Sequence, residues 1–527
     1  MFHILAADPI STEGLSVLQH DPNVTVTDET GLSPDELENR IDQFDALLVR
    51  SQTKVTRSVI EKASRLKIIG RAGVGVDNID LDAATEHGVL VVNAPNGNTN
   101  SAAEHTMAMT MALSRQIPQA HLSLQNGKWD RKKYVGFELK GKKLGIIGLG
   151  RIGTEVAYRA KGQRMDVIAY DPFFTEEKAD QMGIEYGTLE DVFQEADYIT
   201  VHTPLLKDTH HMINADAFSK MKDGVHIMNC ARGGIIEEDA LYDAIVSGKV
   251  AGAAIDVLED EPFQDHKLLQ LPQVIATPHL GASTVEAQEN VAIDVCRDII
   301  NHLTGEMAQN PVNMPSVPSD VLSQIEPYFH LADKLGTFLI HLTEDVPEEV
   351  NVYYSGELSD VKMAPITRNA VKGLLQRHLG SHVNDVNALY LAEQKGITIN
   401  ESRTATTKGF TNLLTVEVKT NSGARSVSGT LLNGLGPRIV RVDQYSVDVV
   451  PQGHLVIIHH KDLPGVIGNM GSLLSQYHVN IATMQVDRSN VGGDAIMILT
   501  VDKFLDKDEM TALKQLEEIS DVTAVDL

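Results

Sequence analysis

Three side chains of different chemical types, Arg232, Glu261 and His279, each lie just beyond an apolar run of strand length. An imidazole titrates near neutrality and can accept a hydroxyl proton. A carboxylate hydrogen-bonded to its other ring nitrogen would fix the tautomer and favour the imidazolium. A guanidinium can hold a carboxylate with two parallel hydrogen bonds. Together the three groups suit the oxidation of a 2-hydroxy acid by a nicotinamide cofactor.

The glycine-rich segment 148–153 predicts where that cofactor binds. It reads Gly-Leu-Gly-Arg-Ile-Gly, follows an apolar run and lies about twenty residues before Asp171, a spacing typical of dinucleotide sites. Gly148 permits a tight turn, Gly150 lets the backbone approach a pyrophosphate, and Gly153 allows the next helix to pack closely. The Asp171 carboxylate would accept hydrogen bonds from ribose hydroxyls and repel a 2′-phosphate. The sequence therefore predicts NAD rather than NADP, with an ordinary tight turn as the alternative.

The N-terminal region offers further cations. Arg50 follows an apolar run, and Arg71 opens the glycine-rich loop 71–78, whose backbone N–H groups could bind an anion. With Arg232, these residues predict two anion sites, which suit a substrate carrying both a carboxylate and a phosphate. Each side chain taken alone also fits an ordinary surface or turn position, and only their joint placement at strand ends favours a site. Cys230 is better suited to line the nicotinamide pocket than to act as a nucleophile, because hydride transfer needs none.

The totals restrict the class of protein. A chain of 527 residues is too long for one hydrophobic core, so we expect several domains. Its 45 basic and 72 acidic residues give a net charge of −27, which argues against a nucleic-acid partner. Two cysteines cannot form a disulfide framework, and no paired-cysteine metal site is expected, which fits a reducing, cytoplasmic setting. The N-terminus lacks a signal-peptide pattern, and no stretch reaches membrane-spanning length, so we expect a soluble protein.

The order of apolar runs and helical patterns predicts an α/β fold with two Rossmann-like lobes. Residues 1–97 alternate short apolar runs with helical patterns, and residues 143–276 repeat strand and helix as in a doubly wound parallel sheet. A helical pattern over 98–117 leads into the second lobe, and another over 283–303 returns to the first. We expect a discontinuous substrate-binding lobe from 1–97 plus 284–311 and an NAD-binding domain at 98–283.

Two smaller domains are expected after a proline-rich boundary at 310–318, because clustered prolines forbid a continuing helix. The segment 319–450 mixes helical patterns with alternating strands, which predicts an α+β domain without a catalytic constellation. The segment 453–527 reads strand, helix, strand, strand, helix, strand. That order is the ferredoxin-like βαββαβ unit.

Up to about residue 311 the chain resembles the D-isomer-specific 2-hydroxyacid dehydrogenases. The matching blocks are 71–78, 95–98, 148–153, 229–234 and 278–284. The resemblance implies that Arg232, Glu261 and His279 are catalytic and that no metal takes part. It implies NAD contacts at Gly148, Gly150, Arg151, Ile152, Gly153, Asp171, Thr203, Pro204, Cys230, Ala231, Asp256 and Gly281. It implies substrate contacts at Arg50, Arg71, Val74, Gly75, Asn98 and Arg232.

The whole length is similar to the long form of this family, in which an intervening regulatory domain precedes a C-terminal ACT domain. The long form implies oxidation of 3-phospho-D-glycerate to 3-phosphohydroxypyruvate at the start of L-serine biosynthesis, inhibition by serine, and assembly as a tetramer. Segments 462–465 and 479–481 match ACT ligand signatures, so His460, Asp462 and Asn480 are candidate serine contacts. Because Asp462 replaces the Asn of some relatives, the strength of inhibition stays open, as does an ACT domain that only assists assembly.

Two other functions remain as alternatives. One is a dehydrogenase for another D-2-hydroxy acid, such as glycerate, lactate or 2-hydroxyglutarate. The other is an NADH-sensing binding protein on the same scaffold, similar to transcriptional corepressors. The three catalytic side chains, the ACT segment and the acidic charge favour an enzyme over the sensor.

Overall fold

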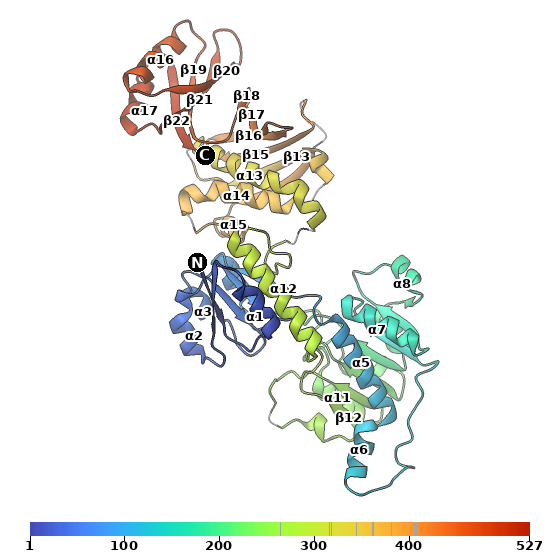
Figure 1. The fold of residues 1–527 in the computed structure, drawn as a ribbon. Helices are drawn as coiled ribbons and strands as arrows, with labels where there is room; N and C mark the ends of the chain where they lie inside the picture. The colour runs from blue at the N-terminus through green and yellow to red at the C-terminus, as the bar shows by residue number, and fades with distance from the viewer. Residues whose placement is uncertain are drawn as a thin grey trace.

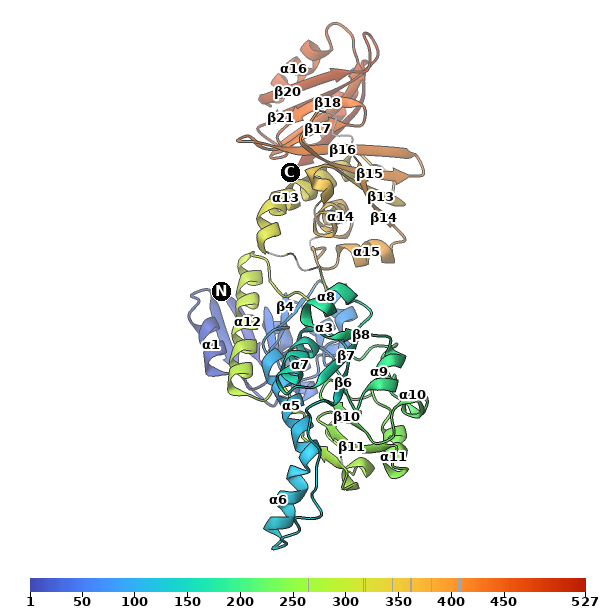
Figure 2. The same ribbon diagram turned by 90° about the vertical axis from the view of Figure 1, so that its right-hand side faces the viewer.

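A computed structural model describes residues 1–263, 265–315, 317, 319–343, 345–360, 363–380, 382–404 and 409–527. These residues form four β-sheets, two of them all parallel, one mixed and one antiparallel, so the expected fold class is confirmed. The two parallel-sheet lobes lie at one end of an elongated molecule, and the C-terminal domain lies at the other (Figures 1 and 2). Among the described residues, no helix combines the length and apolar character that a membrane span requires.

The first lobe is a parallel sheet in the order β2-β1-β3-β4-β5. Its strands are β1 (Phe2–Ala6), β2 (Val24–Asp28), β3 (Ala46–Val49), β4 (Ile68–Arg71) and β5 (Leu90–Asn93). Its helices are α1 (Thr12–Gln19), α2 (Pro34–Arg40), η1 (Ile41–Gln43), α3 (Arg57–Lys62) and α4 (Leu81–Glu86). The long helix α12 (Val285–Thr304) returns from the second lobe and packs on α1, with Val295 and Ile299 in the buried core of this lobe.

The second lobe is a parallel sheet in the order β12-β11-β10-β9-β6-β7-β8. Its strands are β6 (Lys143–Ile147), β7 (Asp166–Tyr170), β8 (Glu185–Tyr186), β9 (Tyr198–Val201), β10 (Val225–Asn229), β11 (Val250–Ile255) and β12 (Val274–Ala276). Its helices are α5 (Thr99–Arg115), α7 (Arg151–Gly162), α8 (Glu176–Met182), α9 (Leu189–Glu195), α10 (Ala215–Lys220), α11 (Glu238–Val246) and η2 (Lys267–Gln270). Because β6 lies between β7 and β9, the strand order reverses beside it, which is where ligands bind in such sheets.

The helix expected over 98–117 is divided in the structure. It ends at Arg115, because Gln116 adopts a left-handed conformation with φ of 51°, and α6 (Ile117–Gln125) begins with a proline in its first turn. Helix α6 and the segment after it project away from the lobe (Figure 2), and no residue of α6 is buried. This projecting arm, residues 117–137, exposes several large apolar side chains, among them Leu122, Leu124, Trp129, Val135 and Phe137.

The intervening domain is a mixed sheet in the order β14-β13-β15-β16-β17-β18. Its elements are α13 (Ser319–His341), β13 (Glu349–Gly356), η3 (Glu357–Asp360), α14 (Ala364–Leu379), α15 (Ala388–Gln394), β14 (Thr398–Thr404), β15 (Asn412–Thr420), β16 (Gly423–Leu432), β17 (Gly436–Val442) and β18 (Tyr445–Val449). Apolar residues of α13 and α14 form one core with this sheet. Ser316 and Pro318 of the predicted proline-rich boundary lie outside the described residues, and the predicted domain boundaries stay predictions.

The C-terminal domain has the expected βαββαβ order. Its elements are β19 (His454–Lys461), α16 (Val466–Gln476), β20 (Ile481–Arg488), β21 (Asp494–Val501), α17 (Lys507–Lys514) and β22 (Ile519–Asp526), with the sheet ordered β20-β21-β19-β22. One sheet face packs under its own helices, and Leu455 and Ile457 on the other face join the core of the intervening domain. The intervening domain and the C-terminal domain therefore share an apolar core at their junction, in addition to the core that the C-terminal domain forms with its own helices.

Candidate active site

The turn after β6 has the shape that a dinucleotide phosphate requires. Gly148 has φ of 98°, and a side chain there would collide with the backbone carbonyl of His202. A side chain at Gly153 would collide with the carbonyl of Gly148, so α7 packs directly on the turn. At Gly150 a side chain would meet open space, and the N-terminus of α7 that follows has no side-chain cap. Its free N–H groups are available to an anion.

Asp171 and Thr203 complete this part of the cleft. One Asp171 oxygen accepts a hydrogen bond from the N–H of Leu149 at 2.8 Å, so the carboxylate lies directly beside the glycine turn. The Thr203 hydroxyl, after β9, is buried and has no hydrogen-bond partner in the part of the chain that the structure describes. An orphaned buried hydroxyl, an uncapped helix end and a carboxylate beside the turn fit the phosphate and ribose groups of NAD.

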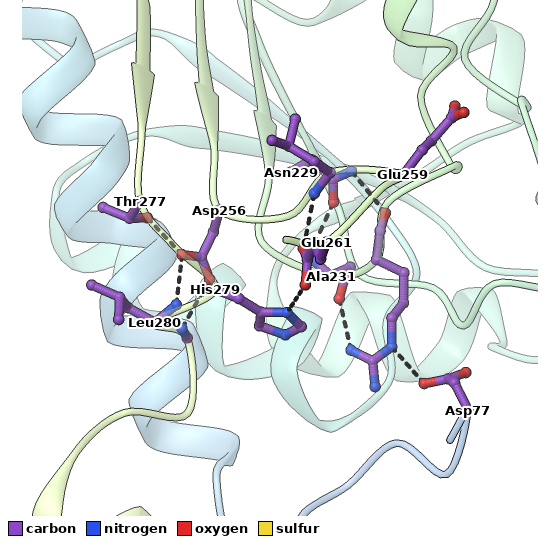
Figure 3. Close-up of polar contacts among 12 residues, drawn as sticks. Asp77, Asn229, Ala231, Asp256, Glu259, Glu261, Thr277, His279 and Leu280 are labelled. Atoms are coloured by element: carbon purple, nitrogen blue, oxygen red, sulfur yellow. Dashed lines mark hydrogen bonds and ion pairs between the residues drawn. The ribbon is translucent and has the colours of Figure 1, made fainter. Parts of the chain in front are cut away.

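His279 and Glu261 are in direct contact (Figure 3). His279 Nδ1 lies 2.7 Å from Glu261 Oε2, and the N–H of Leu258 donates to Glu261 Oε1 at 2.9 Å. Burial raises the pKa of Glu261, but the hydrogen bonds from His279 and Leu258 outweigh burial and leave its pKa lowered. An ionised Glu261 therefore occupies Nδ1, which leaves Nε2 of His279 free for a substrate proton.

Arg232 lies where the two lobes meet. Its Nε donates to Asp77 of the first lobe at 3.2 Å, and its Nη1 donates to the carbonyl of Ala231 at 2.7 Å (Figure 3). Asn229 shapes the turn, because its side chain accepts from the N–H of Ala231 and donates to the carbonyl of Arg232. A side chain at Gly75 would collide with the Arg232 guanidinium, so this glycine permits the close approach of the lobes.

Arg71 is a half-buried cation, and one of its side-chain nitrogens has no partner within the described ranges. Burial, together with the positive charges of Arg232 and Arg50, lowers its pKa to about 10, although Asp77 and Asp8 partly offset this effect. Its Nε is buried and has no hydrogen-bond partner among the described residues. An unpaired buried guanidinium is costly, and a bound anion would remove the cost.

The remaining predicted contacts surround these groups. Asn98 stands at the start of α5, with its side-chain oxygen buried and unpartnered, and the carbonyl of Val74 accepts from the Asn93 side chain at 2.5 Å. Cys230 is buried, and burial beside Asp256 raises its pKa to about 12, so its thiol stays protonated at neutral pH. Arg151 and Ile152 open α7, and Pro204 follows Thr203.

Asp256 anchors the segment that carries His279. Its carboxylate accepts from the hydroxyl of Thr277 at 2.5 Å and from the N–H groups of Leu280 and Gly281, both at 2.8 Å. His105 on α5 also reaches this carboxylate, with Nε2 at 3.2 Å from Asp256 Oδ1. Sequence reasoning missed His105, because a histidine within a helical pattern gives no sign of which strand end it meets.

The predicted serine contacts do not come together within one chain. His460 and Asp462 lie at the end of β19, whereas Asn480 precedes β20, whose first residue Ile481 pairs with Val501 beside the start of β19. About 20 Å of strand therefore separates them. His460 is buried with an unpartnered Nε2, and Asp462 accepts from Arg488 and from the N–H of Gly492, at 2.8 and 3.1 Å.

Three family models match successive parts of the chain. Residues 107–281 match "D-isomer specific 2-hydroxyacid dehydrogenase, NAD binding domain". Residues 324–443 match "D-3-phosphoglycerate dehydrogenase intervening domain", and residues 454–518 match "ACT domain". The order of the matches along the chain agrees with the order of the second, third and fourth sheets.

Curated relatives match over the full length. The chain is 44% identical to the D-3-phosphoglycerate dehydrogenase of Bacillus subtilis, over all of this chain and 99% of that protein. It is also 44% identical to the enzyme of the same name from Methanocaldococcus jannaschii, over the whole of both proteins. A crystal structure of D-lactate dehydrogenase from Aquifex aeolicus, complexed with NAD and lactic acid, is 29% identical with a TM-score of 0.54, over 60% of this chain and all of that one.

Proposed function

The chain belongs to the D-3-phosphoglycerate dehydrogenase family, and from that membership we propose that it oxidises 3-phospho-D-glycerate to 3-phosphohydroxypyruvate, the first step of L-serine biosynthesis. It is an NAD-dependent oxidoreductase of the D-isomer specific 2-hydroxyacid dehydrogenase type. The observation that carries the choice of substrate is the group of three arginines, Arg50, Arg71 and Arg232, at the junction of the lobes.

The arrangement of the side chains supports a direct mechanism. The nicotinamide ring of bound NAD supplies the hydride acceptor. Nε2 of His279 accepts the proton of the substrate's 2-hydroxyl group, while Glu261 stabilises the imidazolium that forms. Arg232 holds the carboxylate and stabilises negative charge on the oxygen as it becomes a carbonyl. The C–H electron pair leaves as hydride and the O–H proton goes to His279, which balances the oxidation.

The arginine group favours a substrate with two anionic ends. Arg71 is half-buried, has an unpartnered Nε and is destabilised by both of its neighbouring arginines. A monocarboxylate such as lactate would neutralise only one of these cations. A carboxylate on Arg232 and a phosphate on Arg71 and Arg50 would compensate all three.

The proposal is tested by NADH formation from purified protein. We expect absorbance at the NADH wavelength to rise with 3-phospho-D-glycerate and to rise at least tenfold less steeply with D-glycerate, D-lactate or D-2-hydroxyglutarate. Faster turnover of one of the unphosphorylated acids would identify that acid as the substrate instead. No turnover of any of these acids, with NADH still bound, would favour the NADH sensor, against which the contact of His279 with Glu261 argues.

We also propose that serine inhibits the enzyme at a site shared by two chains. This follows from the distance between Asp462 and Asn480 within one chain, because a ligand as small as serine cannot span it. Two C-terminal domains related by a two-fold axis would place Asp462 of one copy near Asn480 of the other. Serine added to the full chain should reduce NADH formation, whereas a variant with Asp462→Ala should respond only at much higher serine concentrations.

The projecting arm supports a second contact between copies. Its large side chains, Trp129 among them, are more exposed than a soluble surface favours, and α6 contributes none to the core of its own lobe. Two different two-fold contacts, one through the arm and one through the C-terminal domain, would build a tetramer. Light scattering should then give four times 57.5 kDa, and replacing Leu122, Leu124 and Trp129 with charged residues should give half that mass. The same mass for both proteins would exclude the arm.

We propose a cytoplasmic location, which the state of the two cysteines supports. Cys230 and Cys296 are both buried and unpaired. Burial raises the pKa of each thiol to about 12, so neither is poised to form a disulfide.

A further inference from the structure

His105 takes no part in the mechanism above, yet it contacts the buried carboxylate behind His279. It lies on α5, and its Nε2 is 3.2 Å from Asp256 Oδ1 and 3.1 Å from the Thr277 hydroxyl. The Asp256 side chain is 1% exposed, whereas the His105 side chain is 19% exposed. Helix α5 thus places Nε2 of His105 against Asp256 and Thr277, next to the segment that carries His279.

The hydrogen-bond pattern fixes which atom of His105 carries hydrogen. The Thr277 hydroxyl has one hydrogen, and the bond to Asp256 at 2.5 Å is much shorter than its other contact, to the Met109 sulfur at 4.0 Å. With that hydrogen on Asp256, the Thr277 oxygen can only accept from His105. Asp256 is also an acceptor. Nε2 of His105 faces both acceptors and is therefore the protonated nitrogen, with its N–H shared between them.

Asp256 transmits this contact to the backbone around His279. Its carboxylate holds the N–H groups of Leu280 and Gly281, and its own carbonyl accepts from the N–H of His279 at 2.9 Å. His279 itself has φ of 55°, a conformation that a residue with a side chain adopts only when its surroundings enforce it. The hydrogen bonds to Asp256 supply that constraint on both sides of His279.

We propose that His105 is a positioning residue for the reaction: its Nε2–H orients the Asp256 carboxylate, which holds the segment 277–281 so that His279 meets Glu261. The inference rests on the proposed function, because it concerns the same His279. It differs from a packing role, in which any side chain of similar volume would serve at this position of α5.

The charged surroundings of Asp256 set the direction of the pH effect. Burial raises the pKa of Asp256, but the hydrogen bonds from His105, Thr277 and Leu280 together outweigh burial and leave it lowered. The other titratable groups that face Asp256 are Cys230 after β10 and Glu261 after β11. Removing the His105 N–H takes away the largest of the stabilising contacts, so Asp256 would take up a proton at higher pH.

The test compares two variants of the full-length protein. His105→Gln keeps an N–H donor near the same position, whereas His105→Leu keeps the volume and removes the donor. We expect His105→Leu to lower kcat about thirtyfold with little change in KM for 3-phospho-D-glycerate, since misplacing a catalytic group by about 1 Å can cost up to a hundredfold. We expect His105→Gln to stay within about threefold of the wild type. The acidic limb of the kcat profile should move to higher pH in His105→Leu only.

A second measurement does not depend on turnover. In protein labelled with ¹⁵N-histidine, the Nδ1 signal of His279 should report its hydrogen bond to Glu261 in the wild type and in His105→Gln, and should change in His105→Leu. Equal kcat values, equal pH profiles and equal His279 signals for the two variants would overturn the inference. A wild-type protein that forms no NADH would defeat the proposed function alone, because the His279 signal would still decide the role of His105.

Discussion

The cleft between the lobes and the C-terminal domain both collect candidate ligand contacts from separate strand ends, but only the cleft brings them together in one chain. In the parallel sheet of the second lobe, the residues after β10, β11 and β12 reach the same edge, so Glu261 and His279 meet (Figure 3) and Arg232 follows the neighbouring strand end. In the C-terminal sheet, β19 and β20 both pair antiparallel with β21 and therefore run parallel to each other. His460 lies at the end of β19, whereas Asn480 precedes the start of β20, so the two residues lie at opposite edges of the sheet.

The difference shows when the position of residues next to their strands predicts that they form one binding site. All strands of a parallel sheet run the same way, so "after a strand" specifies one edge of the sheet. In the C-terminal domain one candidate lies at the end of its strand and the other precedes its strand, which places them at two edges, and a site assembled from both would need a second copy of the chain. The predictions below test both halves of this comparison, beginning with the largest effect.

The first prediction concerns the cleft. Replacing His279 with Ala removes the group placed to accept the hydroxyl proton, and general-base catalysis contributes about 10²- to 10⁴-fold, so kcat should fall by about a thousandfold. The affinity for NAD should stay within a factor of about two, because the dinucleotide contacts lie on other strand ends. Steady-state NADH formation and a fluorescence titration with NADH measure the two quantities. His20→Ala, at the exposed end of α1, is the matched control. Near-normal turnover by His279→Ala would show that the side chains gathered at this edge of the sheet do not catalyse the reaction in the proposed way.

The features of the site that could be predicted from the sequence are those that depend on a local pattern. The Gly148 turn, the strand ends at Asp171 and Asp256, and the three catalytic candidates could be predicted, because each is a local pattern and a parallel sheet gathers them at one edge. His105 could not, because its partner depends on how α5 packs against the sheet.

Other features depended on backbone details that no pattern reports. The break at Gln116, which directs α6 away from the lobe, arises from one left-handed residue that is neither glycine nor asparagine. The strand at 24–28 has a weak pattern, because it alternates valine with threonine at the edge of its sheet and is only partly buried. The mixed pattern of residues 319–450 does not predict which strands pair, since the pairing depends on contacts between distant segments.

A second prediction concerns the phosphate end of the cleft. Arg71→Ala should lower kcat/KM for 3-phospho-D-glycerate by about a hundredfold, the size of effect that follows from losing a buried charge-assisted pair. Turnover of D-glycerate, which lacks the phosphate, should change by less than about threefold. Arg65→Ala is the control, because its exposed side chain pairs with Asp45 in the same lobe and lies outside the cleft. An equal loss for both substrates would assign Arg71 to the structure of the lobe rather than to the phosphate.

A third prediction uses pH. The folded-state pKa of Asp256 is lowered, so its carboxylate contributes stability above its unfolded pKa of about 3.9, and this contribution is lost as the pH falls through the folded value. Asp256→Asn places an amide among the same donors, and one donor must then lose its acceptor, at a cost of about 2 kcal/mol. Urea unfolding should show this difference from wild type at pH 5 to 8 and a smaller one at pH 3. A difference that did not shrink in acid would mean that packing, rather than ionisation, makes Asp256 important.

The last prediction tests the C-terminal half of the comparison by mixing chains. Asp462→Ala and Asn480→Ala should each raise the serine concentration that halves activity by about tenfold, since each removes one hydrogen-bonding group from the site. If a site takes Asp462 from one copy and Asn480 from another, an assembly of both variants contains some sites with both groups intact. Co-expressed chains carrying one substitution each should therefore regain part of the response at the wild-type serine concentration, whereas a chain with both substitutions, co-expressed with itself, should not. A mixture that responds no better than either variant alone would place the whole serine site within one chain or remove it from this domain. The cleft would then no longer differ from the C-terminal domain in the number of chains that build a site.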